Sequence, residues 1–238
     1  MFNKFCFYFM LFIIYSFIGW SIEVVGKLIE KHKFINRGFL VGPICPIYGW
    51  GCIAIILLLS KYKSSPIVLF LMAIIICSIL EYFTSYFMEK LFHVRWWDYT
   101  RRKYNINGRI CAETMIPFGL LGCLVVYIVN PIFTGLLNKI PVNILNILAI
   151  IIFTIYVIDN IVSLSVMFGF KGTLKTVEKD GTEEITKKVR EVLLKRNFLY
   201  KRLVNAFPNI TSKKERLELL ESKINVEIEK LKNKMEKK

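Results

Sequence analysis

PIVLFLMAIIICSILEYFTSYFM, residues 66–88, contains a single charged side chain, that of Glu81. A helix needs about 20 mostly apolar residues to cross the hydrocarbon core of a bilayer, and this stretch is long enough. The whole chain has the same character, because 55% of its 238 residues are hydrophobic and 14% are aromatic. That composition is too apolar for a soluble domain of this size. We therefore predict an integral membrane protein with the lipid bilayer as its surroundings.

Four further blocks are almost free of charge, namely residues 5–26, 47–59, 110–129 and 142–168. Three of them meet the length of a membrane span, and the block at 47–59 does so only if residues 38–46 are included. The blocks predict an all-α polytopic helical bundle with five transmembrane segments over residues 1–169. Residues 170–238 carry 19 basic and 11 acidic side chains and are predicted to form a cytoplasmic, basic, helical tail.

The second predicted segment is broken. NRGFLVGPICPIYGWG, residues 36–51, contains Gly42, Pro43, Pro46 and Gly49, and two prolines three residues apart do not fit an unbroken helix. Unwound backbone at membrane depth is tolerated only against protein or a wet cavity, and broken helices often mark binding sites in transporters. The pattern leaves two interpretations open: a ligand site, or a packing kink or re-entrant entry without a ligand.

The basic residues predict the orientation. Loop 27–38 carries four, loop 92–109 carries five and the tail carries nineteen, whereas the opposite side has only Lys4, Lys61, Lys63 and Lys139. Cytoplasmic loops of membrane proteins are rich in Lys and Arg, so the net charge of +15 needs no nucleic-acid partner. We expect a multi-pass protein of the cell (plasma) membrane with its N-terminus outside and its C-terminus cytoplasmic.

Five acidic residues lie in or beside the predicted segments, and they are Glu23, Glu81, Glu89, Glu113 and Asp159. Such groups are costly in lipid and usually face the interior of a bundle. Helical spacing places Glu23, Glu81 and Asp159 each on a stripe of small or polar residues. At 1.5 Å per residue, Glu81 and Asp159 lie about 14 Å deep, and the other three lie near the cytoplasmic ends. The sequence therefore predicts an intramembrane acidic site that deepens toward Glu81 and Asp159.

HVRWWDYTRRKYNINGR, residues 93–109, joins two apolar blocks and is predicted to cap this site. The tryptophans and Tyr99 suit an aromatic belt at headgroup level, but Asp98 among arginines suggests a structured cap. Its candidate residues are Arg37, Arg95, Trp96, Trp97, Asp98, Tyr99 and Arg109. Three alternatives stay open: arginines that pair with Glu23, Glu89 and Glu113, arginines that bind an anionic or zwitterionic headgroup, and a cation or proton path through the deep acids.

The tail pattern predicts one helix from Thr182 to Pro208 and a second after the capping box SKKE at 212–215. This is either a solvated tail along the membrane or a helical element that recruits a cytoplasmic partner. GFKGTLKT, residues 169–176, lacks the spacing of a phosphate-binding loop, so an ATPase for ATP-driven transport must be a separate chain. The six cysteines and two histidines form no metal-ligand pattern, and we expect no metal and no cofactor.

Several motifs resemble one bacterial membrane-protein family. YSFIGWSIEVV, NRGFLVGPICPIYGWG, EYFTSYFMEKLFHVRWWDYT, YNINGRIC and FGLLG, in this order over about residues 8–168, are similar to the family called putative ABC-transporter type IV, or CmpB-like permease. The resemblance implies a permease subunit and transfers no catalytic or substrate residues. CAETM, residues 111–115, departs from the usual aliphatic-and-serine continuation after GRIC, which weakens Glu113 as a family-wide site residue.

The leading functional hypothesis is a transporter permease component without its own ATPase, able to form a homo-oligomer. The alternatives are a scaffold or regulatory protein that acts through its tail and, less favoured, an enzyme that acts on lipid headgroups. No residues are assigned as catalytic, because no Ser/His or metal-ligand constellation is present.

Overall fold

The computed structural model describes residues 1–92, 94–179, 198–199, 202, 206 and 211–212. Its helical elements are α1 (Phe2–Lys31), α2 (Pro46–Leu59), the 3₁₀ turn η1 (Ser60–Tyr62), α3 (Pro66–Phe92), α4 (Ala112–Leu124), the π-helical turn η2 (Val125–Val129), α5 (Asn130–Leu137) and α6 (Val142–Lys179). Four two-residue strands form two antiparallel pairs: β1 (Val94–Arg95) with β4 (Thr211–Ser212), and β2 (Asn105–Ile106) with β3 (Ile110–Cys111). The predicted all-α membrane bundle is confirmed.

Four helical stretches are long and apolar enough to cross a membrane: Phe2–Lys31, Pro66–Phe92, Ala112–Leu137 and Val142–Gly169. The predicted second segment is different, because Pro46–Tyr62 is a shorter apolar helix. Pro43 lies in the non-helical connection before it, and Pro46 is the first residue of α2, where a missing N–H costs no helical hydrogen bond. The count of five spans thus stays a prediction.

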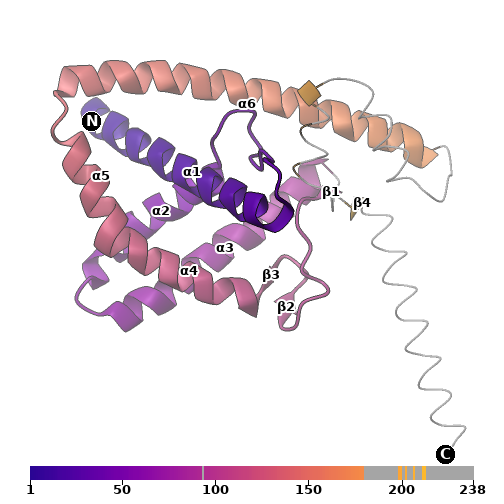
Figure 1. The fold of residues 1–238 in the computed structure, drawn as a ribbon, viewed down its shortest axis with the longest axis horizontal. Helices are drawn as coiled ribbons and strands as arrows, with labels where there is room; N and C mark the ends of the chain where they lie inside the picture. The colour runs from indigo at the N-terminus through magenta and orange to yellow at the C-terminus, as the bar shows by residue number, and fades with distance from the viewer. Residues whose placement is uncertain (93, 180–197, 200–201, 203–205, 207–210, 213–238) are drawn as a thin grey trace, which may run out of the picture.

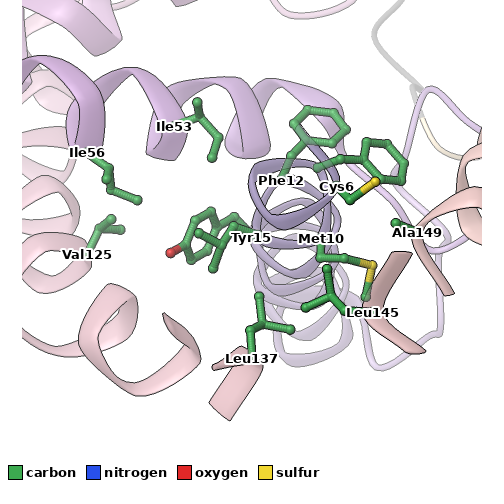
Figure 2. Packing of buried hydrophobic residues seen from close by; sticks show 12 residues of the cluster. Cys6, Met10, Phe12, Tyr15, Ile53, Ile56, Val125, Leu137, Leu145 and Ala149 are labelled. Atoms are coloured by element: carbon green, nitrogen blue, oxygen red, sulfur yellow. The ribbon is translucent and has the colours of Figure 1, made fainter. Parts of the chain in front are cut away.

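Helix α1 lies between α2 and α6 (Figures 1 and 2). Its Phe12 and Tyr15 are buried among apolar residues of the surrounding helices. The core around them contains Ile53 and Ile56 of α2, Val125 of η2, Leu137 of α5, and Leu145 and Ala149 of α6. Helix α1 therefore packs against both α2 and α6, which are distant from each other in sequence.

Glycines allow α1 and α2 to approach closely. A Cβ atom on Gly49 would lie 2.6 Å from Phe12 Cδ2 and 2.7 Å from the Phe12 carbonyl oxygen, and would overlap the Ser16 hydroxyl. Gly19 faces the ring of Tyr48 in the same way. Small residues at such contacts let membrane helices pack backbone to backbone. This packing brings the Tyr48 hydroxyl within reach of Glu23, one turn further along α1.

The connections alternate between the two ends of the bundle (Figure 1). Residues 32–40 and 94–111 lie at one end, which we call the cap end, and the described residues 202, 206 and 211–212 contact them there. Residues 41–45 turn back along the bundle and contact Asp159 of α6 and Ser16 of α1. The connections at 63–65 and 138–141 lie at the opposite end. The loops with the highest basic charge thus share one end, as the charge pattern predicts.

Helix α6 continues beyond residue 169 as far as Lys179. The helices predicted from Thr182 to Pro208 and after the capping box at 212–215 lie largely outside the described residues. Residues 198–199, 202 and 206 of the first are described and helical, and Thr211–Ser212 form β4, which pairs with β1.

Candidate functional site

The cap is built on a tight hairpin. Asn107 and Gly108 both have positive φ, 51° and 65°, and link β2 to β3. A Cβ atom on Gly108 would lie 2.7 Å from Asp98 Oδ1, so glycine is required by both conformation and space. The Tyr99 amide donates to the Gly108 carbonyl at 2.8 Å. The NING segment therefore closes against the DYT segment and directs Arg109 toward α3.

Two arginines of the cap converge on one carboxylate of α3. Glu89 Oε2 accepts hydrogen bonds from Arg95 Nη2 at 3.0 Å and Arg95 Nε at 3.2 Å, and lies 2.7 Å from Arg109 Nη2. All three side chains are largely buried, with exposed fractions of 11% for Glu89, 6% for Arg95 and 11% for Arg109. We call these three residues the latch.

Neighbouring groups complete the latch. Asp98 Oδ1 lies 3.6 Å from Arg95 Nη1, so two acidic and two basic groups balance each other. The Arg109 guanidinium also lies over the rings of Tyr82 and Tyr86, 5.6 and 5.4 Å from their centroids. Cation–π contacts of this kind stabilise a desolvated arginine.

The two tryptophans of the cap lie within the protein rather than in a lipid-facing belt. Trp96 is buried and packs edge-on against Phe39 at a centroid distance of 6.2 Å. Trp97 is partly buried, and its indole N–H donates to the Arg109 carbonyl at 3.0 Å. Their role in this structure is to pack the cap and to position the backbone of Arg109.

The shallow acids do not form one ring. Glu23 lies 3.4 Å from Arg37 Nε and accepts a 2.7 Å hydrogen bond from the Tyr48 hydroxyl. Glu113 instead pairs with Arg102 at 3.0 Å, and more than half of each side chain is exposed. Arg109 is only four residues from Glu113 in the sequence, which favours their pairing. In the structure, the hairpin turns Arg109 back toward α3, where it contacts Glu89 instead.

Glu81 has a different environment from the other acids. It is 8% exposed, and its Oε1 accepts a 3.2 Å hydrogen bond from the Tyr99 hydroxyl. Its Oε2 is buried without a hydrogen-bond partner among the described residues, and so is the hydroxyl of Ser78, one turn earlier on α3. Burial raises the pKa of Tyr99 above its usual range, and the nearby carboxylates of Glu81 and Glu23 raise it further. Tyr99 is therefore a neutral donor to Glu81.

Asp159 has its own set of partners. Its carboxylate accepts hydrogen bonds from the Val41 amide at 2.8 Å, the Gly42 amide at 2.9 Å and the Ser163 hydroxyl at 3.1 Å. The sequence groups Asp159 with Glu81, whereas the structure places it against the connection between α1 and α2. Gly42 is needed there, because a Cβ atom would lie 2.9 Å from Asp159 Oδ2.

Three contributing residues are not among the sequence candidates: Tyr48, Arg102 and Arg202. Arg202 donates to the carbonyls of residues 38–40 from a position more than 160 residues away in the chain. No local pattern marks such a residue among nineteen basic side chains of the tail. Among the described residues, no group of three or more His, Cys, Asp or Glu side chains is arranged to hold a metal ion.

The comparison with protein families agrees with this architecture. The sequence model of the family described as "Putative ABC-transporter type IV" matches residues 10–164. The chain belongs to this family. The matched region extends from α1 to α6 and includes the cap. No curated protein and no solved structure matches the chain. Family membership and the four apolar helices together indicate a multi-pass membrane protein of the transport type.

Proposed function

We propose that this protein is the permease component of a membrane transport system and that Glu81 is the centre of a cation-binding site in it. The proposal rests on the Oε2 atom of Glu81, which has no hydrogen-bond partner among the described residues. Glu81 is only 8% exposed. A buried carboxylate is expensive unless a proton, a metal cation or a basic side chain neutralises it.

The arrangement of the arginines supports a cation over an anion. Arg95 and Arg109 contact Glu89, and Arg37 contacts Glu23, so these guanidinium groups already have carboxylate partners. Among the described residues, no lysine or arginine bonds to Glu81, and the nearby charge that acts on it is that of Glu23. Glu81 therefore has no basic side chain bonded to it that would compete with a bound cation.

The groups near Glu81 offer oxygen atoms, the chemistry that a proton or a monovalent metal cation requires. Ser78 offers a hydroxyl without a partner, Tyr99 donates to the opposite carboxylate oxygen, and Tyr48 and Glu23 lie on the adjoining helices. Oxygen ligands suit hard cations. In this proposal Asp159 is a positioning residue that holds the connection between α1 and α2, and the latch holds the cap over the site.

The membrane orientation and the energy source belong to the same proposal. The basic loops at the cap end support a cytoplasmic cap in the plasma membrane, with the N-terminus outside. Because the sequence holds no phosphate-binding loop, ATP-driven transport would use an ATPase on a separate chain that docks at the cytoplasmic side.

The experiment is infrared difference spectroscopy of the full chain in lipid nanodiscs, with Glu81→Gln and the matched control Glu113→Gln. One arm varies the pH, and the second adds Na⁺ or K⁺ at fixed pH. We expect a carboxyl band that responds in one arm, disappears in Glu81→Gln and persists in Glu113→Gln. The responding arm identifies the cation. Identical spectra for Glu81→Gln and wild type in both arms would refute the site, and unchanged cation flux of Glu81→Gln in liposomes would refute its role in transport.

A further inference from the structure

We propose that the turn at residues 38–42 is a docking site for a guanidinium group and that the protein's own C-terminal segment occupies it through Arg202. The segment consists here of the described residues 202, 206 and 211–212. Docking clamps the connection between α1 and α2. The proposal stands independently of the transport site.

Three consecutive backbone carbonyls converge on one side chain. Arg202 Nη1 donates to the Leu40 carbonyl at 2.6 Å and to the Gly38 carbonyl at 3.3 Å, and Nη2 donates to the Phe39 carbonyl at 3.1 Å. A planar guanidinium with several fixed N–H donors can satisfy such a set, whereas a lysine ammonium has a different geometry. The turn is thus shaped for an arginine.

A carboxylate lies on the other side of the same turn. Asp159 accepts the amides of Val41 and Gly42, the two residues that follow the carbonyls bound by Arg202. The peptide groups of the turn therefore have a positive charge on their carbonyl side and a negative charge on their amide side. Burial lowers the pKa of Arg202, and the Asp159 carboxylate opposes this shift. The two charges stabilise a non-helical backbone that would otherwise have unsatisfied polar groups.

Two further contacts attach the segment to the cap. Arg37 Nη1 donates to the carbonyl of Ala206, which is fully buried. Thr211 and Ser212 form β4, which pairs with β1 in the register Arg95 with Thr211. Arg37 also contacts Glu23, and Arg95 also contacts Glu89, so the segment touches two of the arginines that pair with the shallow acids. The docked segment is therefore coupled to the site end of α1 and α3.

Hydrogen–deuterium exchange of the full chain in lipid nanodiscs tests the proposal. The variant is Arg202→Gln, and the control is Arg101→Gln, which removes the same charge from an exposed position in the cap. Loss of several charge-assisted hydrogen bonds should raise exchange of peptides covering residues 36–42 by about tenfold or more. Exchange at residues 94–98 should also rise, because the segment that carries β4 loses one of its two other contacts with the cap end and keeps only that of Ala206 with Arg37 among the described residues. Arg101→Gln should match wild type.

Two additional measurements keep the result decisive. If Arg202→Gln fails to fold, Arg202→Lys replaces it, because lysine keeps the charge but lacks the planar guanidinium. Peptides covering residues 36–42 should then exchange faster than in wild type but more slowly than in a chain whose segment is undocked. Exchange of Arg202→Lys equal to that of wild type overturns the proposal. Protection should also be independent of protein concentration, since the segment docks within its own chain. Protection that falls on dilution would assign the docked arginine to a second copy and overturn the intramolecular clamp. A folded Arg202→Gln variant that exchanges at the wild-type rate would also overturn the proposal.

Discussion

Substitution of Glu89 by Gln removes the charge from the centre of the latch and keeps its shape. Glu89 is the shared partner of Arg95 and Arg109, and all three side chains are nearly inaccessible to solvent. In the variant, Arg95 still has Asp98 at 3.6 Å, but Arg109 has no carboxylate partner among the described residues. It keeps the neutral amide oxygen of the new side chain, the Ser85 hydroxyl and the faces of two tyrosines. One buried positive charge is thus left without a carboxylate.

The size of the effect follows from burial. Removing one partner from a buried ion pair costs about 3–5 kcal/mol, because the remaining charge stays desolvated. The matched control is Glu113→Gln, which makes the same chemical change in a pair whose exposed fractions are 61% for Arg102 and 57% for Glu113. An exposed pair contributes about 0–1 kcal/mol. We therefore expect Glu89→Gln to be less stable than Glu113→Gln by about 2 kcal/mol or more.

The assay is equilibrium unfolding in mixed micelles with increasing SDS, followed by far-UV circular dichroism. Both variants are compared with wild type in the same detergent, so the difference between them reports the burial of Glu89 and its second arginine partner. If the two variants unfold within about 1 kcal/mol of each other, the latch contributes no more than a surface pair and the reasoning from burial is wrong.

Two other perturbations test the packing and the electrostatics of the site. Gly49→Ala should destabilise the protein by about 1–3 kcal/mol, because the new Cβ atom would collide with the Phe12 backbone. The control Gly135→Ala should be neutral or stabilising, because no atom lies within 4 Å of the added Cβ position. Thermal unfolding of the two variants measures the difference. The raised pKa of Tyr99 means that its contribution to stability is complete below the usual phenol pKa of about 10 and is lost as the pH rises toward the higher folded-state value. Tyr99→Phe should therefore unfold less steeply than wild type in an alkaline titration, and identical alkaline profiles would contradict the burial of this hydroxyl beside Glu81.

The break in the second apolar block could be predicted in detail. Pro43 and Pro46 exclude a continuous helix through residues 38–51, and the structure begins α2 at Pro46. Glu81 could also be placed on a buried stripe of α3, because Ser78 and Ser85 share its helical face and both are buried. These features depend on residues that are close in sequence, where backbone sterics and helical periodicity fix the geometry.

The pairing of the charged groups could be predicted only in part. The position of Arg95, six residues after Glu89, favours their contact, but the hairpin at Asn107 and Gly108 is what turns Arg109 onto the same carboxylate. Glu113 pairs with Arg102 instead, and Asp159 pairs with backbone amides rather than with the deep acid of α3. A charge pattern shows which groups need partners and leaves the choice among them to loop geometry.

The sequence by itself determined that this chain is an apolar helical bundle with one strongly basic set of loops, because hydropathy, proline sterics and net charge act locally along the chain. Only the tertiary structure decided that the cap arginines are neutralised by Glu89 and Glu23 while Glu81 keeps an oxygen without a partner. It also decided that Arg202 and Asp159 hold opposite sides of one turn. Such contacts join residues up to 164 positions apart. Their energy depends on distance and burial, which are defined only after the helices have packed.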